Sequence, residues 1–335
     1  MKRLLLANFC IGVTVCTVAT VCGGEQTPSP TVDPKPLRIV ATIAMAGDLA
    51  QNIGGTRVAV TNLMREGVDP HLYKASPGDM RLMSDADMIL FSGLHLEGRM
   101  ADIIVKMASR TTVVQVTDAI DESLLREPPE FAGHFDPHVW FDVTLWAKAA
   151  ERVRDALVAK DSPGREVYQK NAESFLMMLA ELHQYAKITL ATIPEQHRVM
   201  VTAHDAFGYF GRAYGLEVLA IQGISTDSEA SLRDINTLVD TLVRKKVPAV
   251  FIESSVPRKT IDALVEGCKS RGHSVLVGGE LFSDAMGKSG TFEGTYVGMV
   301  VHNVDTVTKA LGGKVPAQKP ALVAAHAESV SKAKS

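Results

Sequence analysis

Cysteine is almost missing from the body of this chain. Of the four cysteines in 335 residues, three lie in the first 22 positions, and only Cys268 lies further along. A single thiol cannot close a disulfide within the body or build a cysteine-based metal site. Any metal that the body holds must therefore be bound through nitrogen and oxygen.

An excess of positive charge is also missing. The chain has 35 Lys and Arg against 38 Asp and Glu, which gives a formal net charge of −3. This balance does not indicate the basic face that nucleic-acid binding needs, so we expect no nucleic-acid partner. Hydrophobic residues at 46% and charged residues at 22% are typical of a soluble globular protein. The length suits two domains of about 150 residues each.

One long uncharged apolar run lies at the N-terminus, directly after Lys2 and Arg3, and reads LLLANFCIGVTVCTVATVC. A basic start followed by an apolar core is typical of a secretory signal, so we predict that residues 1–22 are a signal- or lipoprotein-like leader. The ending ATVC resembles a lipobox and makes Cys22 a candidate for lipidation. Simple cleavage and a retained anchor are the alternatives, since about 20 apolar residues span a bilayer. The expected location is extracytoplasmic, in the periplasm or at the cell surface.

Two further segments have compositions that disfavour a packed core. Residues 23–36 are rich in Gly, Pro and polar residues and are predicted to form a flexible tether. Residues 313–335 are rich in Ala, Lys and Ser and are predicted to form a disordered tail.

Short apolar runs alternate with longer amphipathic stretches, first over residues 37–161 and again over residues 194–312. Near-continuous apolar strands between helices indicate parallel sheets that are covered on both faces. The predicted fold class is α/β, with two Rossmann-like lobes. The predicted strands are residues 37–43, 58–64, 87–92, 111–117, 198–204, 216–222, 248–254 and 273–279.

One long helix is predicted between the lobes, over residues 162–193. Ser162 and Pro163 favour its start, and Pro194 ends it. No Pro or Gly interrupts residues 165–193, so we expect a rigid backbone helix of about 25–30 residues. Apolar side chains at steps of three and four place one stripe along it. The stripe consists of Tyr168, Ala172, Phe175, Leu179, Leu182 and Ala186.

The tripeptide Asp-Pro-His occurs twice, at residues 69–71 and again at residues 136–138. Proline fixes its own φ and restricts the preceding residue, so each turn presents its imidazole from a stiff loop. His71 follows the strand at 58–64, and His138 precedes a helix expected near Val143. The repetition predicts two loops with the same task.

A third histidine, His204, ends the strand at 198–204, where open α/β sheets bind their ligands. The loop after the strand at 273–279 offers Glu280 and Asp284 as a carboxylate. Three imidazoles and a carboxylate suit Zn²⁺ and, less well, Mn²⁺. The other histidines of the body are interpreted as structural or surface residues: His95, His134, His183, His197, His273, His302 and His326.

Six ordered segments resemble the TroA/ZnuA-like proteins, the zinc- and manganese-binding subunits of metal ABC transporters. The resemblance covers nearly all of residues 37–312 and implies two α/β lobes, one long connecting helix and a metal ion between the lobes. It carries the ligand role onto His71, His138, His204 and Asp284, which selects Asp284 over Glu280. The segments are GVDPHLYKAS, DPHVWFD, TAHDAFGYF, FIESS, GGELFSDAMG and GTYVGMVVHN.

Two departures from the family pattern bear on the metal. Zinc-dedicated relatives often carry a long His- and acid-rich loop between the first two ligands, whereas the stretch before His138 adds only His134. Manganese- and iron-type relatives often have Glu at the position of His204. Three imidazoles favour Zn²⁺, and the missing loop keeps Mn²⁺ as an alternative cargo.

Carboxylates near the ligands are expected to fix the tautomer of each imidazole through its second nitrogen. The candidates are Asp136, Asp142, Asp205 and Glu253. A turn or capping role is the alternative, above all for Asp136. In STDSEASL, Thr226 and Glu229 are predicted to form a capping box for the next helix.

The expected function is to capture Zn²⁺ or Mn²⁺ outside the cytoplasmic membrane and to deliver the ion to an ABC permease. We expect the protein to act as a monomer and not as an enzyme. A zinc hydrolase with Glu280 as general base is the rival hypothesis. Four protein ligands would leave no open position for its water, which argues against it. A secondary role as a surface adhesin is a third reading.

Overall fold

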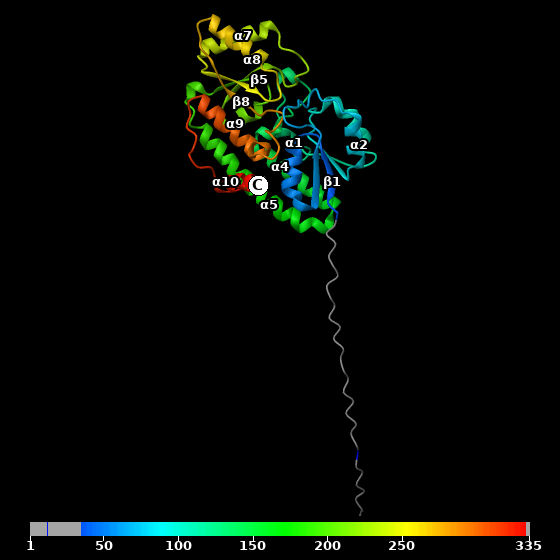
Figure 1. Ribbon diagram of the computed structural model, residues 1–335. Helices are drawn as coiled ribbons and strands as arrows, with labels where there is room; N and C mark the ends of the chain where they lie inside the picture. The colour runs from blue at the N-terminus through cyan, green and yellow to red at the C-terminus, as the bar shows by residue number, and fades with distance from the viewer. Residues whose placement is uncertain (1–11, 13–34, 333–335) are drawn as a thin grey trace, which may run out of the picture. The chain divides into compact units, whose positions relative to one another are not determined.

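The computed structural model describes Gly12 and residues 35–332 (Figure 1). The leader with Cys22, almost all of the tether and residues 333–335 lie outside the described residues. From Lys35 onward the chain belongs to one compact unit. Within the described residues, no helix is both long and apolar enough to cross a membrane.

The first lobe contains a four-stranded parallel sheet in the order β2-β1-β3-β4. Its inner strands are apolar and buried, as the sequence predicts. The strands are β1 (Leu37–Ala41), β2 (Val58–Asn62), β3 (Met88–Phe91) and β4 (Thr112–Gln115). The helices are α1 (Ala44–Gly54), α2 (Pro77–Asp85), α3 (Ala101–Met107) and α4 (Val143–Lys160).

The second lobe contains two parallel strand pairs, β5 with β6 and β7 with β8. The strands are β5 (Val199–His204), β6 (Glu217–Gln222), β7 (Ala249–Glu253) and β8 (Leu276–Leu281). The helices are α6 (Gly208–Tyr214), α7 (Leu232–Lys245), α8 (Lys259–Ser270) and α9 (Tyr296–Ala310). The predicted α/β class with parallel strands is confirmed.

Strand β8 lies later in the chain than its predicted span of 273–279. His273 belongs to the turn after α8, because its N–H donates to the carbonyl of Cys268 and its ring contacts the carbonyl of Val247. Glu280 is therefore part of the strand and exposed, while Asp284 still follows the strand end.

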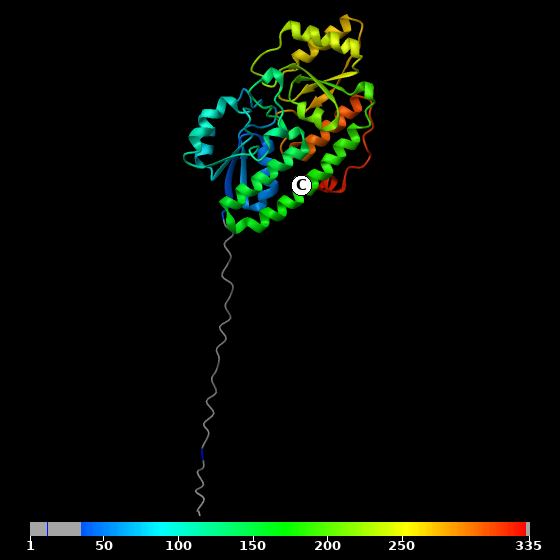
Figure 2. The same ribbon diagram turned by 180° about the vertical axis from the view of Figure 1, so that it is seen from behind.

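Helix α5 (Arg165–Leu190) is 26 residues long and passes both lobes, shown in green in Figure 2. All six residues of the predicted stripe are buried, against α1, α4 and α9. Its start differs from the prediction, because residues 162–164 form a 3-10 turn in which Gly164 N–H donates to the carbonyl of Asp161. Ser162 is therefore not its cap.

Two helices begin with a capping box. Ser76 caps α2 together with Asp79. The predicted Thr226–Glu229 box is wrong, since α7 is capped by Ser231 with Asp234. Thr226 precedes that helix by too many residues, and its hydroxyl is bonded elsewhere.

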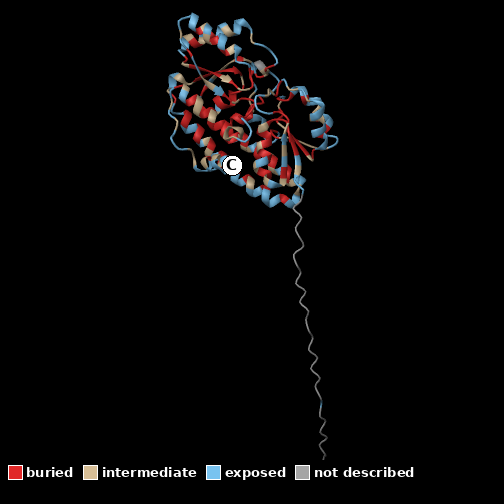
Figure 3. Cartoon of the chain, viewed as in Figure 1, coloured by how far each residue is buried: buried red, intermediate tan, exposed pale blue. Residues whose placement is uncertain are grey.

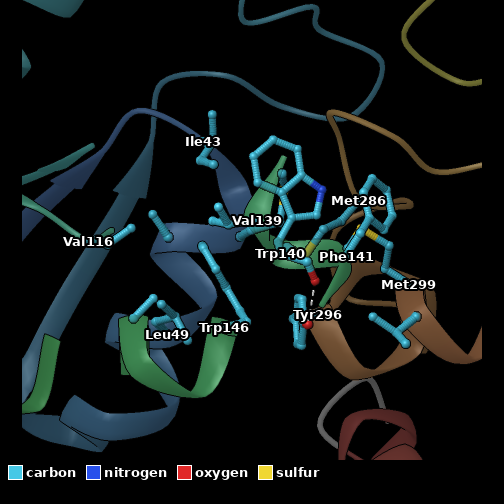
Figure 4. Packing of buried hydrophobic residues seen from close by; sticks show 14 of the residues in the cluster. Ile43, Leu49, Val116, Val139, Trp140, Phe141, Trp146, Met286, Tyr296 and Met299 are labelled. Atoms are coloured by element: carbon cyan, nitrogen blue, oxygen red, sulfur yellow. Dashed lines mark hydrogen bonds between the residues drawn. The ribbon is translucent and has the colours of Figure 1, made fainter. Parts of the chain in front are cut away.

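The two lobes share one hydrophobic core around Trp140, Trp146 and Tyr296. Figure 4 shows these rings beside Met286 and Met299 of the second lobe. The Tyr296 hydroxyl donates to the Trp140 carbonyl at 2.7 Å, across the junction. Figure 3 shows the buried residues on the strands and on the inward faces of the helices.

Part of the predicted disordered tail is helical. Helix α10 (Ala321–Lys332) packs on α5, with Val323 fully buried and the N–H of Leu322 donating to Glu181. Lys319 forms an ion pair with Asp305 and lies over the Tyr185 ring. Val323 is the residue that this Ala-rich segment buries, while the side chain of Leu322 stays exposed, and composition alone did not reveal this contact.

Candidate metal centre

Four buried side chains from four separate loops and strand ends meet between the lobes: His71, His138, His204 and Asp284. Each offers one potential ligand atom, and these atoms all lie within 4.8 Å of one another. In the described part of the chain this is the one group of three or more His, Cys, Asp or Glu with such spacing.

The spacing of the ligand atoms fits a single transition-metal ion. The Nε2 atoms of His71 and His138 are 3.3 Å apart. Asp284 Oδ1 lies 3.3 Å from His138 Nε2, and Asp284 Oδ2 lies 3.2 Å from His204 Nε2 and 3.9 Å from His71 Nε2. A tetrahedral ion with bonds of about 2.0–2.1 Å separates its ligands by about 3.3–3.4 Å.

Asp284 presents both carboxylate oxygens to this space. Both are buried, and neither has a well-oriented hydrogen bond in the described residues. Buried carboxylate oxygens without donors are costly unless a cation or a proton satisfies them. The arrangement therefore accommodates a divalent ion through one or both oxygens.

The two Asp-Pro-His turns share one hydrogen-bond pattern. Asp69 Oδ1 accepts the backbone N–H of His71 at 2.9 Å, and Asp136 Oδ1 accepts that of His138 at 3.0 Å. Each aspartate thus closes a local turn around the proline. This explains the repeated tripeptide, because each copy fixes the backbone of one histidine.

Carboxylates also contact the second nitrogen of two imidazoles. Asp136 Oδ1 lies 2.8 Å from His138 Nδ1, and Glu253 Oε2 lies 2.6 Å from His204 Nδ1. The other oxygen of Glu253 accepts the N–H groups of Ala203 and His204 at 2.7 and 2.9 Å. A carboxylate beside Nδ1 favours the tautomer with its proton on Nδ1, which leaves Nε2 free to bind a metal.

Of the remaining sequence candidates, Asp142 caps a helix and Glu280 lies outside the four-residue group, while the role of Asp205 stays a prediction. Asp142 caps α4, where its Oδ1 accepts the N–H and hydroxyl of Thr144. Asp205 follows His204, and its backbone N–H donates to the Gly223 carbonyl. Glu280 is exposed on β8 and is not a member of the four-residue group.

The site's electrostatics follow from burial and close charges. Burial lowers the pKa of His71 to about 3. Burial also acts against charge on His138, but Asp136 and Asp284 outweigh it and raise its pKa to about 9. The pKa of His204 is raised by Glu253 and Asp284, again against burial. Burial alone would raise the pKa of Asp284, yet His204 and His138 hold it well below its usual range.

The Asp284 loop is tied to the first lobe beside the three histidines. Trp140, two residues after His138, donates its indole N–H to the Ser283 carbonyl at 3.1 Å. The Ser283 hydroxyl pairs with that of Ser255 at 2.9 Å. The loop is thus held by bonds from both lobes, which sequence reasoning did not reveal.

Two further contacts join the lobes and are called here the cross-lobe bridges. The Thr226 hydroxyl donates to Asp69 Oδ2 at 2.6 Å, and Arg99 pairs with Asp227 at 2.5 Å. Asp69 thus holds the His71 backbone with one oxygen and the second lobe with the other. Asp69 and Asp136 occupy the same position of the repeated tripeptide. This repetition was the signal that could have identified Asp69 as a residue that holds its histidine.

The histidines outside the site differ in their surroundings. His183 packs on Tyr214, with its Nδ1 at 3.3 Å from the hydroxyl. His197, His273 and His302 contact backbone carbonyls. His326 is partly buried near Phe292. His95 and His134, distant in sequence, lie against each other.

Known proteins match this fold and this sequence over most of the chain. The family model described as zinc-uptake complex component A, periplasmic, matches residues 39–310. The manganese-binding lipoprotein MntA of Bacillus subtilis is 47% identical over 93% of this chain and 100% of its own length. The zinc-binding protein TroA of Treponema pallidum is 47% identical over 83% of this chain and 90% of its own length.

Solved structures agree with the sequence matches. The periplasmic zinc-binding protein TroA from Treponema pallidum superposes with a TM-score of 0.81 at 45% identity, over 82% of this chain and 99% of that one. Fe(III)-bound YtgA from Chlamydia trachomatis gives a TM-score of 0.75 at 28% identity, over 84% and 99%. The chain therefore belongs to the family described as zinc-uptake complex component A, periplasmic.

Proposed function

We propose that this chain captures one Zn²⁺ or Mn²⁺ ion outside the cytoplasmic membrane and delivers it to an ABC permease for import. The observation that carries the proposal is the buried group of His71, His138, His204 and Asp284. Its atom spacings fit one ion, and its ligands come from both lobes. Membership in the family and relatives named as zinc- or manganese-binding proteins support the same function.

The choice of metal follows from the ligand set. Three imidazole nitrogens favour Zn²⁺ over the harder Mn²⁺, whereas the carboxylate supports both ions. The relatives differ in the same respect, since one is named for manganese and another for zinc. We propose Zn²⁺ as the tighter ligand and Mn²⁺ as a second cargo.

A binding role without catalysis agrees with the ligand count. A catalytic zinc site keeps a position open for water and needs a general base nearby. Here four side chains converge on the ion's position, and Glu280, the base that a hydrolase would require, is exposed on β8. We therefore propose no enzymatic step.

The layout of the mature protein is part of the proposal. The ion would lie between lobes of residues 37–161 and 194–312, which the helical segment 162–193 joins. Relatives named as lipoproteins support anchoring through Cys22, and we propose that the chain acts as a monomer at the membrane surface.

The test has two parts. Metal analysis of protein purified without added metal should find one divalent ion per chain, and competition should rank Zn²⁺ above Mn²⁺. Cells that depend on this protein for growth under chelation should lose metal uptake with His204→Ala and keep it with His183→Ala. Normal uptake with His204→Ala would overturn the proposal.

A further inference from the structure

A second pair of histidines meets outside the buried site. His95 and His134 are both exposed, and their ring centroids lie 4.4 Å apart with planes at 70°. We propose that these two imidazoles form a second, weaker transition-metal site for a divalent ion that prefers nitrogen, such as Zn²⁺, Cu²⁺ or Ni²⁺, with water completing the coordination.

The ring spacing suits a shared ion. Two imidazoles bound at a right angle by bonds of about 2.0–2.1 Å have centroids about 4.5 Å apart. In the buried group, the corresponding centroids lie 5.3 Å apart for two pairs and 6.0 Å for the third. The centroid spacing of the exposed pair therefore matches two imidazoles at adjacent positions of one ion, once each ring turns a nitrogen toward it.

The loop that carries His95 is held in an uncommon conformation. Gly93, Leu94 and His95 have φ values of 90°, 53° and 66°, and two of these residues carry a side chain. Such strain persists only where the surroundings impose it, and it is concentrated at functional sites. His95 lies in this loop and contacts His134 from it.

Glu97 is the group that imposes this conformation. Its buried carboxylate accepts the N–H groups of Ser92 and Gly93 at 2.7 and 3.1 Å and the Thr42 hydroxyl at 2.6 Å. A buried carboxylate is costly, and here three donors satisfy it. Burial raises the pKa of Glu97, and its hydrogen bonds to Thr42, Ser92 and Gly93 oppose that rise. The fold therefore uses a buried carboxyl group to fix the start of the His95 loop.

The second loop is fixed as well. Gly133 has φ of 83°, and its N–H donates to Glu127 Oε1 at 3.0 Å. The N–H of His134 donates to the Phe131 carbonyl at 3.0 Å. His95 and His134 line one open cavity of about 480 Å³, which leaves room for an ion and its waters.

This site should be weaker than the buried one. It offers two protein ligands, and in the described residues neither ring has a carboxylate on its second nitrogen, unlike His138 and His204. Loss of one such partner typically costs 10–100-fold in affinity, so we expect a difference of at least about 100-fold. Mn²⁺ should bind here poorly, because it prefers oxygen ligands.

The test is a Zn²⁺ titration by calorimetry, with full-length protein that carries no polyhistidine tag. The expected result is one tight step followed by one weak step. His95→Asn and His134→Gln should each remove the weak step and leave the tight one intact. Asn is chosen at position 95 because it tolerates positive φ better than most residues. His183→Ala is the matched control and should change neither step.

The outcomes separate this proposal from the proposed function. The second site would be overturned if the weak step were missing or if it survived both substitutions. It would also be overturned if Mn²⁺ bound in the weak step with the same affinity as Zn²⁺. The buried site would stay in place in each case. Loss of the tight step in the native protein would instead overturn the proposed function. Circular dichroism of each variant checks that the fold is retained.

Discussion

Glu253 contacts His204 twice: one carboxylate oxygen accepts the histidine's backbone N–H at 2.9 Å, and the other lies 2.6 Å from its Nδ1. In the first lobe, Asp136 contacts both the backbone N–H and the Nδ1 of His138 with a single oxygen, Oδ1. Each lobe therefore fixes one imidazole by both its backbone and its ring. Metal affinity should depend on these carboxylates although they do not touch the ion.

The first prediction concerns Glu253→Gln. The amide oxygen can still accept the backbone N–H groups, but the amide NH₂ then faces Nδ1 and favours the tautomer with its proton on Nε2. That tautomer cannot bind metal through Nε2, so affinity for Zn²⁺ should fall by about 10–100-fold. Competition with a chelator measures the change. Glu280→Gln is the control, and equal affinities for the two variants would refute the role of Glu253.

The second prediction concerns the cross-lobe bridges. The Thr226 hydroxyl bonds a partly buried carboxylate, and hydrogen bonds to charged groups are worth about 1.5–3 kcal/mol. The exposed Arg99–Asp227 pair should be worth only about 0.2–1 kcal/mol. Thr226→Val should therefore speed metal release more than Arg99→Gln does. Stopped-flow transfer of the metal to a chelator measures both rates.

Thr237→Val, on the exposed face of α7, is the control for that comparison. If Thr226→Val releases metal no faster than this control, the bridge to Asp69 does not hold the site closed.

The third prediction concerns pH and stability. Burial raises the pKa of Asp48 to about 7, although the N–H of Tyr296 partly opposes the shift. Between about pH 4 and 7 the folded state then binds more protons than the unfolded state, so stability should fall as pH rises through this window. Urea unfolding of Asp48→Asn should show a smaller decline from pH 5 to pH 8. An unchanged slope would contradict the raised pKa.

The fourth prediction concerns the change on metal release. Helix α5 has no internal Pro or Gly and packs on both lobes, and the shared core around Trp140 and Tyr296 crosses their junction. A wide hinge opening would break this core, so we expect closely similar scattering profiles with and without metal. Hydrogen exchange should change near residues 223–231 and stay constant along residues 168–186. A wide opening with faster exchange along α5 would contradict this account.

The fold could be predicted from sequence because its signals are local and periodic. Apolar runs overlapped every strand of the described residues, although β8 lies later than predicted, and steps of three and four residues located the buried stripe of α5. The tail was misjudged because one buried apolar residue, Val323, in an Ala-rich segment is a weak signal. The error for Thr226 had another cause, since its partner Asp69 is distant in sequence and only the folded chain shows their bond.

The candidate site was predictable in part, because some of its signals are local in the sequence. The repeated Asp-Pro-His turn and strand-end positions singled out three histidines, but they left Glu280 and Asp284 open until the family resemblance was used. The contact of His95 with His134 depends on two loops with left-handed residues, and no sequence pattern announced it.

The most direct test of the central claim is the X-ray absorption fine structure of the protein loaded with one equivalent of Zn²⁺. If His71, His138, His204 and Asp284 bind the ion together, the spectrum should fit three imidazoles and one or two carboxylate oxygens at about 2.0–2.2 Å. A sulfur shell at about 2.3 Å, which a cysteine would have to supply, or fewer than three imidazoles would contradict it.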